Sequence, residues 1–259
     1  MFIEFRALSM FLLERIKRHH FSLCTLTAMI PWLAFANVII HGTRVIYPQD
    51  QQEVSIQLSN DGDQPALVQA WLDIGDPDEK ISNISVPFVL MPPVFRIEPH
   101  AGQTLRLTST GIAQPQDRES IYWLNVLDIP PKDLNLKGEN VLKMAIRSRI
   151  KIFFRPPGLD MAGARNSYAR LIWGYLESTS PKIMPVKNPT PYFINIASVT
   201  LENRDRKIKS LNGEMIPPFS TGEIAFNSIL DRPDYSKLTY EVVNDFGTII
   251  VLKNQNAPM

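Results

Sequence analysis

The stretch Gln116-Asp-Arg-Glu-Ser-Ile-Tyr-Trp-Leu-Asn-Val-Leu-Asp-Ile-Pro-Pro131 contains the pattern from which the fold can be worked out. Within it, Ile121-Tyr-Trp-Leu-Asn-Val126 alternates in the way that a β-strand requires, because successive side chains of a strand point to opposite faces. This stretch predicts a strand near the middle of the chain, and segments of the same kind lie on both sides of it.

Short runs rich in β-branched residues recur before and after this stretch and are separated by turn residues. They make about seven or eight strands in about 120 residues, the number typical of an immunoglobulin-type sandwich. The predicted strands are Val38–Tyr47, Glu53–Ser59, Ala66–Leu72, Phe88–Met91, Val94–Ile97, Thr104–Thr108, Ile121–Val126 and Val141–Phe154.

Arg155-Pro156-Pro157-Gly158 interrupts the pattern, because proline cannot continue a central strand. A second series of strands follows, so we predict an all-β protein with two immunoglobulin-like β-sandwich domains, residues 37–156 and 157–259, joined by a short, stiff elbow. The second series comprises Tyr168–Tyr175, Ile183–Val186, Tyr192–Leu201, Ile208–Leu211, Glu223–Phe226, Leu238–Val243 and Thr248–Leu252.

The N-terminus has the composition of an export signal. A basic patch at residues 15–18 precedes an apolar run from Phe21, which ends in Ala34-Phe35-Ala36. A basic region, an apolar core and a small-residue end predict a signal peptide, residues 1–36, cleaved after Ala36. Cleavage removes Cys24, the only cysteine. A retained N-terminal anchor is the alternative, and translation could begin at Met10.

Several motifs together resemble the periplasmic pilus-assembly chaperones of the chaperone–usher (fimbrial) family. The 116–131 stretch resembles the signature of that family, and Ile150-Lys-Ile-Phe-Phe-Arg-Pro156 resembles its interdomain hinge. The other matching motifs are Thr43-Arg-Val-Ile-Tyr-Pro48, Ala70-Trp71, Pro92-Pro93, Asn188-Pro-Thr-Pro-Tyr-Phe193 and Asn244-Asp-Phe-Gly247. The resemblance covers residues 37 to about 250 and implies two sandwiches joined at an angle, like a boomerang.

The resemblance also implies donor-strand complementation, in which an edge strand of the chaperone fills the open groove of a pilus subunit. The donor strand would be residues 140–151. Leu142, Met144 and Ile146 share one face of it and would fill the groove, with Lys143 and Arg147 on the opposite face. The alternative for this alternation is a strand that faces the core of the chain itself.

By the same resemblance, Arg44 and Lys151 would hold the C-terminal carboxylate of the pilus subunit, since a guanidinium fork and a compact ammonium both suit a carboxylate. Glu119, Arg155 and Asp245 would form an interdomain charge network that sets the angle between the domains. For Arg44 or Lys151 alone, the alternative is an ordinary basic residue on a strand surface.

The implied partners are pilin (fimbrial) subunits and an outer-membrane usher, and no ATP would be needed. A net charge of +1 provides no basic field for nucleic acid. With no clustered metal ligands, phosphate loop or nucleophile motif, we expect no metal site, cofactor, catalytic residue or stable membrane anchor. Self-association in the free state is an expected cost of an apolar edge strand.

Two other functions remain as alternatives. A pilus subunit or adhesin would also have tandem sandwiches, but it should carry an N-terminal donor extension and often a disulfide. A secreted hydrolase would need catalytic residues, but His19 and His20 lie in the predicted signal peptide, and His41 and His100 are isolated in the sequence. The short segment between Pro131 and Asn140 resembles the short-loop subclass of the family.

Overall fold

A computed structural model describes residues 37–77, 84–131, 144–177, 182–203, 206–228, 230 and 233–254. The predicted signal peptide and the predicted groove-filling residue Leu142 lie outside these ranges. In the part of the chain that the structure describes, no helix is long and apolar enough to cross a membrane.

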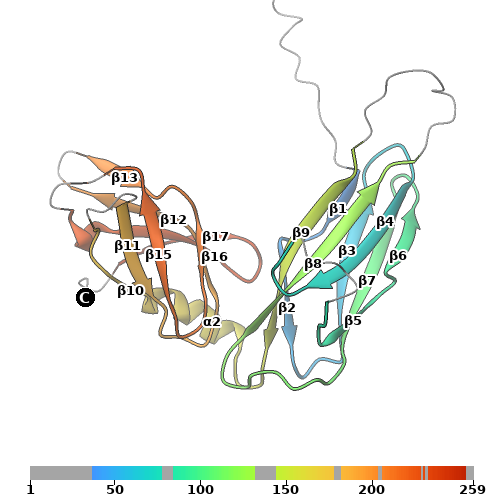
Figure 1. The fold of residues 1–259 in the computed structure, drawn as a ribbon, viewed down its shortest axis with the longest axis horizontal. Coiled ribbons are helices and arrows are strands. Elements are labelled where there is room, and N and C mark those ends of the chain that lie inside the picture. Colours follow the sequence, from blue (N-terminus) through green and yellow to red (C-terminus); the bar gives the residue numbers. More distant parts are fainter. Residues whose placement is uncertain are drawn as a thin grey trace, which may run out of the picture. The chain divides into compact units, whose positions relative to one another are not determined.

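The first nine strands form two sheets (Figure 1). One sheet has the strand order β1-β3-β7-β5, and the other has the order β2-β9-β8-β4-β6. Neighbouring strands are antiparallel except β2 and β9, which are parallel. The strands are β1 (Val38–Ile40), β2 (Arg44–Pro48), β3 (Glu53–Asn60), β4 (Ala66–Asp73), β5 (Phe88–Met91), β6 (Val94–Ile97), β7 (Gly102–Ser109), β8 (Ser120–Ile129) and β9 (Ile146–Arg155).

Alternating side chains of both sheets form the core of this first sandwich. On β3, Ile56 and Leu58 are buried, and the cross-strand partner of Ile56, Leu105, is fully buried. Tyr47 is also fully buried, and its hydroxyl donates to the carbonyl oxygen of Gln51 at 3.0 Å. The core therefore follows the period of two that the sequence shows.

The predicted strand Val38–Tyr47 is two strands, because the chain breaks between β1 and β2. Gly42 has φ +131, a conformation that strongly favours glycine. As a result β1 pairs with β3 in one sheet, whereas β2 pairs with β9 in the other.

The second half of the chain forms a sheet of order β10-β11-β15 and a sheet of order β13-β12-β16-β17, in which β14 also pairs with β12. Residues from both sheets, such as Met184, Ile224 and Val199, pack in one buried cluster. The structure therefore confirms the predicted all-β class with two sandwiches. The strands are β10 (Ile172–Trp173), β11 (Lys182–Lys187), β12 (Ile194–Glu202), β13 (Lys207–Lys209), β14 (Glu214–Ile216), β15 (Thr221–Phe226), β16 (Thr239–Val243) and β17 (Ile249–Lys253).

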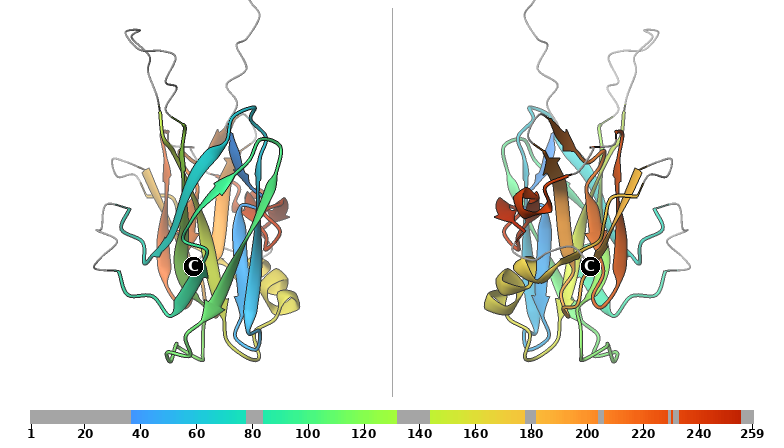
Figure 2. Two further views of the ribbon diagram at one scale, coloured as in Figure 1. Left: turned by 90° about the vertical axis from the view of Figure 1, so that its right-hand side faces the viewer. Right: turned by 90° about the vertical axis from the view of Figure 1, so that its left-hand side faces the viewer.

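The prediction of a strand over Tyr168–Tyr175 is wrong for most of its length. A helix, α2 (Met161–Ser167), ends just before this range, a 3-10 turn, η2 (Tyr168–Arg170), occupies its first residues, and only β10 is strand. Figure 2 shows α2 as a yellow coil among elements that are almost all arrows. Asp160 caps the helix by accepting from the backbone N–H of Gly163 at 2.6 Å, a local signal that the period-of-two pattern overlooked.

A second 3-10 turn, η3 (Tyr235–Lys237), precedes β16. Strand β14 was not predicted from the sequence, because its three residues are too few to show alternation. It pairs with β12, opposite Asn195 and Ile196, and so brings Glu214 close to the site described below.

Candidate functional site

Arg44 and Lys151 are direct neighbours across the parallel pair of β2 and β9. The side chain of Arg44 donates from Nη1 to the backbone carbonyl of Val243 at 2.9 Å. The ammonium of Lys151 donates to Oδ1 of Asn195 at 2.6 Å. The strand register therefore places two cations side by side, and both reach groups of the second half of the chain.

Burial changes the electrostatics of this pair. Desolvation, together with the charge of Arg44, lowers the pKa of Lys151 to about 8, while Glu214 opposes the shift. Desolvation also lowers the pKa of Arg44, and its Nε is buried without a hydrogen-bond partner. Two partly desolvated cations with neutral hydrogen-bond partners favour the approach of an anion.

A hollow of about 250 Å³ lies beside the two cations. Arg44 and Lys151 line it together with Asn195, Glu214 and Val243, among others. The space could hold a carboxylate, since a guanidinium, an ammonium and a side-chain amide all face it. Asn195 and Glu214 were missed in the sequence, because only strand pairing brings them to the cations.

Glu119, Arg155 and Asp245 are in contact. Arg155 Nε lies 2.8 Å from Glu119 Oε1, and Arg155 Nη1 lies 2.9 Å from Asp245 Oδ2. The second oxygen of Glu119 accepts from the backbone N–H of Phe193 at 2.8 Å. The signature, the elbow and the Asn-Asp-Phe-Gly turn therefore meet at one guanidinium.

This cluster is buried: the exposed fractions of the Arg155 and Glu119 side chains are 5% and 2%. Desolvation raises the pKa of Glu119, and the charge of Arg155 opposes that shift. An exposed network would contribute about 1 kcal/mol or less per pair. In a buried network, removal of a single partner lowers the free energy of unfolding by about 3–5 kcal/mol, because it leaves an uncompensated charge.

The beginning of β9 has one open edge. β8 pairs with β9 from Ile146 to Phe154, whereas β2 pairs only with residues 151–155. Among the described residues, 146–150 therefore have a strand neighbour on one side only, and their other edge is available for pairing.

Apolar side chains next to this edge are exposed. The exposed fraction is 65% for Met144 and 42% for Ile146, although Ile152 and Phe154 on the same face are buried in the core. The strand begins at Ile146, so the part of the predicted strand at Met144 and Ala145 is not strand. Leu142 and Lys143 lie outside the described residues.

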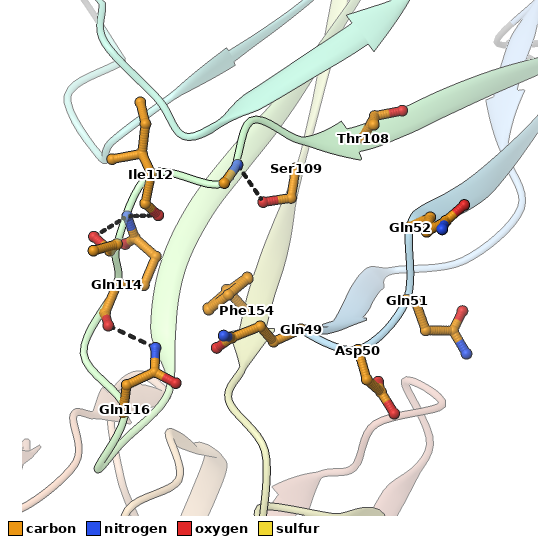
Figure 3. Close-up of a pocket in the computed structure, with 12 residues that line it drawn as sticks. Gln49, Asp50, Gln51, Gln52, Thr108, Ser109, Ile112, Gln114, Gln116 and Phe154 are labelled. Carbon is orange, nitrogen blue, oxygen red and sulfur yellow. Dashed lines mark hydrogen bonds between the residues drawn. The ribbon is translucent and has the colours of Figure 1, made fainter.

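A larger hollow of about 530 Å³ lies elsewhere in the first sandwich and contains none of the predicted site residues (Figure 3). Side-chain amides dominate its lining. The amide of Gln114 donates to the carbonyl of Ala113 at 3.0 Å, and its oxygen accepts from the hydroxyl of Tyr122. Gln116 in turn donates to the carbonyl of Gln114 at 2.8 Å. These amides hold the loop before β8, so we assign no ligand to this hollow.

Comparison with known proteins gives a consistent result over both halves of the chain. Residues 37–160 match the family described as pili and flagellar-assembly chaperone, PapD N-terminal domain. Residues 169–253 match the family described as pili assembly chaperone PapD, C-terminal domain. The probable fimbrial chaperone YadV of Escherichia coli K12 is 38% identical over 237 residues, which is 90% of this chain and 96% of YadV.

Solved structures agree with these matches. The crystal structure of the Pseudomonas aeruginosa CupB2 chaperone has a TM-score of 0.71 at 35% identity and covers 83% of this chain and 98% of CupB2. The SafB chaperone of Salmonella enterica, solved in complex with the SafA pilin, has a TM-score of 0.70 at 26% identity and covers 85% and 98%.

Proposed function

This chain belongs to the pilus-assembly chaperone family, and we propose that it binds pilus subunits by donor-strand complementation. It would shield each subunit from aggregation and pass it to an outer-membrane usher. Chaperones of this family are periplasmic and are not enzymes. By this proposal the chain enters the periplasm after cleavage at Ala36, works as two domains (residues 37–156 and 157–259), and needs neither a catalytic residue nor ATP.

The open edge of β9 is the observation that carries this proposal. Its backbone can form a ladder with an added strand, and main-chain pairing gives affinity without much demand on sequence. Met144 and Ile146 are already exposed beside that edge. Burial of each in a subunit groove would contribute roughly 1.5–3 kcal/mol before the costs of ordering. We propose that Leu142 extends the same row.

The two cations next to this edge would fix the register of the bound strand. Lys151 lies on β9, and Arg44 is its neighbour on β2. A C-terminal carboxylate bound to both would place the last residue of the subunit at one end of the donor strand. The carboxylate contact would then determine which residues of the subunit strand lie opposite Met144 and Ile146.

The buried charge cluster would have a structural role in this scheme. Arg155 contacts acidic residues from both halves of the chain, Glu119 and Asp245. Lys151 and Arg44 likewise bond to residues of the second half, Asn195 and Val243. We propose that the cluster sets the relative orientation of the two domains and thereby keeps the two cations in place.

Co-purification from the periplasm tests the proposal. The chaperone is expressed together with a candidate subunit, and Arg44→Ala and Lys151→Ala are compared with wild type. Both variants should recover much less subunit, while Arg96→Ala, which changes an exposed arginine paired with Glu98, should recover as much as wild type. Equal recovery with all three variants would show that the carboxylate assignment is wrong.

A further inference from the structure

Three cations occupy every second position on the outward face of β9, and each lies over a tryptophan ring. Arg149 Cζ is 4.1 Å from the centroid of Trp123, and Lys151 Nζ is 5.4 Å from the same ring. Arg147 Cζ is 5.8 Å from the centroid of Trp71. Such contacts attract a cation to the face of the ring. Trp123 therefore contacts two of the three cations.

Arg149 is also held by a buried carboxylate. Its Nε donates to Asp73 Oδ2 at 3.1 Å, and its Nη2 contacts the other oxygen. The Asp73 side chain is only 2% exposed and also accepts from Asn125 Nδ2 at 2.7 Å. The Arg149 guanidinium thus contacts both the indole of Trp123 and the carboxylate of Asp73.

The strand register explains this arrangement. Lys151 is opposite Trp123 on β8, and Trp123 is opposite Asp73 on β4. Arg149 is opposite Asn125, so its side chain crosses diagonally to reach both Trp123 and Asp73. Trp123 is on β8, which lies between the proposed donor strand β9 and strand β4, and it is directly opposite Lys151.

We infer that Trp123 is a positioning residue for subunit capture. Its ring holds Arg149, which orients the open edge of β9, and it holds Lys151, which binds the C-terminal carboxylate of the subunit. This inference rests on the proposed function. Residues 146–150 have only β8 as a described strand neighbour, so the face contacts supply orientation that a second strand would otherwise provide. Because the Trp123 ring contacts both cations, it fixes the position of the open edge of β9 relative to the Lys151 ammonium.

The test uses the full chaperone and a synthetic peptide that copies the C-terminal strand of the pilin captured by wild type, as free acid and as C-terminal amide. Wild type should prefer the acid. Trp123→Leu should bind the acid roughly three- to tenfold more weakly and should lose part of the preference for acid over amide. Trp123→Phe should recover most of both, because it restores an aromatic face.

Trp71→Leu is the matched control, since it removes a ring from the same face that contacts Arg147 but neither Arg149 nor Lys151. It should keep the ratio of acid to amide affinity at the wild-type value. A folded Trp123→Leu variant with wild-type affinity and ratio would overturn the inference. Absence of acid preference in wild type itself would count against the proposed function instead.

A measurement on wild type alone keeps the inference testable if Trp123→Leu does not fold. Amides of residues 146–151 whose N–H groups bond to β8 should exchange as slowly as the paired amides of β8, whereas those that point to the open edge should exchange faster. Exchange of the β8-bonded amides at the rate of an unprotected loop would show that the face contacts do not position this strand, and would overturn the inference.

Discussion

Arg155 and Asp245 lie ninety positions apart in the chain, yet Nη1 of Arg155 is 2.9 Å from Oδ2 of Asp245. The same guanidinium contacts Glu119, so one buried cation joins two acidic residues. Exposed fractions of 5% for Arg155 and 12% for Asp245 mean that water does little to compensate a missing partner.

Removal of the central cation should therefore destabilise the protein strongly. For Arg155→Ala we expect the free energy of unfolding to fall by about 3–5 kcal/mol, because Glu119 is left buried and unpaired. Urea denaturation followed by circular dichroism measures this change. Arg96→Ala breaks an exposed ion pair with Glu98 and should cost about 1 kcal/mol or less. Equal losses for the two variants would contradict the burial of the cluster.

Subunit binding should weaken as the pH rises above about 8. In the free chaperone, burial lowers the pKa of Lys151 to about 8, so the ammonium is lost through this range. A bound carboxylate favours the charged form and raises this pKa again, so affinity is fully present at lower pH and declines above the pKa of the free protein.

Titration calorimetry from pH 6.5 to 9.5 measures this dependence. Lys151→Arg is the control, since a guanidinium stays charged over the whole range. Its affinity should not decline in this pH window. A wild-type affinity independent of pH would exclude Lys151 from the binding site.

Asp73 should make stability depend on acid pH. Burial by itself would raise the pKa of this carboxyl, but hydrogen bonds from Arg149, Asn125 and the backbone of Gly75 lower it overall. A depressed folded-state pKa gives stability that is present above the unfolded value, near 3.8, and that is lost as the pH falls through the folded-state value.

Urea midpoints between pH 6 and pH 2 test this for wild type and Asp73→Asn. The difference between the two should shrink as the pH falls, because wild type loses the contribution of the ionised carboxylate. A difference that is constant down to pH 2 would mean that Asp73 does not titrate differently in the folded protein.

A charge at the open edge of β9 should impair capture but not folding. Met144 is 65% exposed, so Met144→Asp should leave the urea midpoint within about 0.5 kcal/mol of wild type. Subunit recovery should fall sharply, because a carboxylate cannot enter an apolar groove without a large desolvation cost.

Val251→Asp provides the matched control for this edge. Val251 is 66% exposed and lies on β17, which is at the end of its sheet. This variant should capture the subunit as wild type does. Unfolding of Met144→Asp, or equal recovery of subunit by the two variants, would contradict the proposed donor edge.

The parts of the fold that the sequence predicted well are those that depend on local alternation. β3 and β7 each show the period of two that separates the core-facing side chains from the solvent-facing ones, and β8 has the same apolar alternation, although Asn125 on its other face is also buried. Alternation gave a wrong prediction where another local signal, a helix cap, determined the structure. The cap at Asp160 starts a helix just before the predicted strand Tyr168–Tyr175, and the 3-10 turn that follows the helix occupies the first three residues of that prediction.

The amino-acid order alone determined the all-β class, the two series of strands and the apolar row that includes Met144 and Ile146, since each is a property of neighbouring residues. Tertiary structure decided which side chains meet. Asn195 reaches Lys151, and Trp123 lies under Arg149 and Lys151, only because strands distant in the chain pair in one register. Burial of the Glu119–Arg155 pair is likewise set by packing, because the exposure of a charge depends on what surrounds it in space and not on its neighbours in sequence.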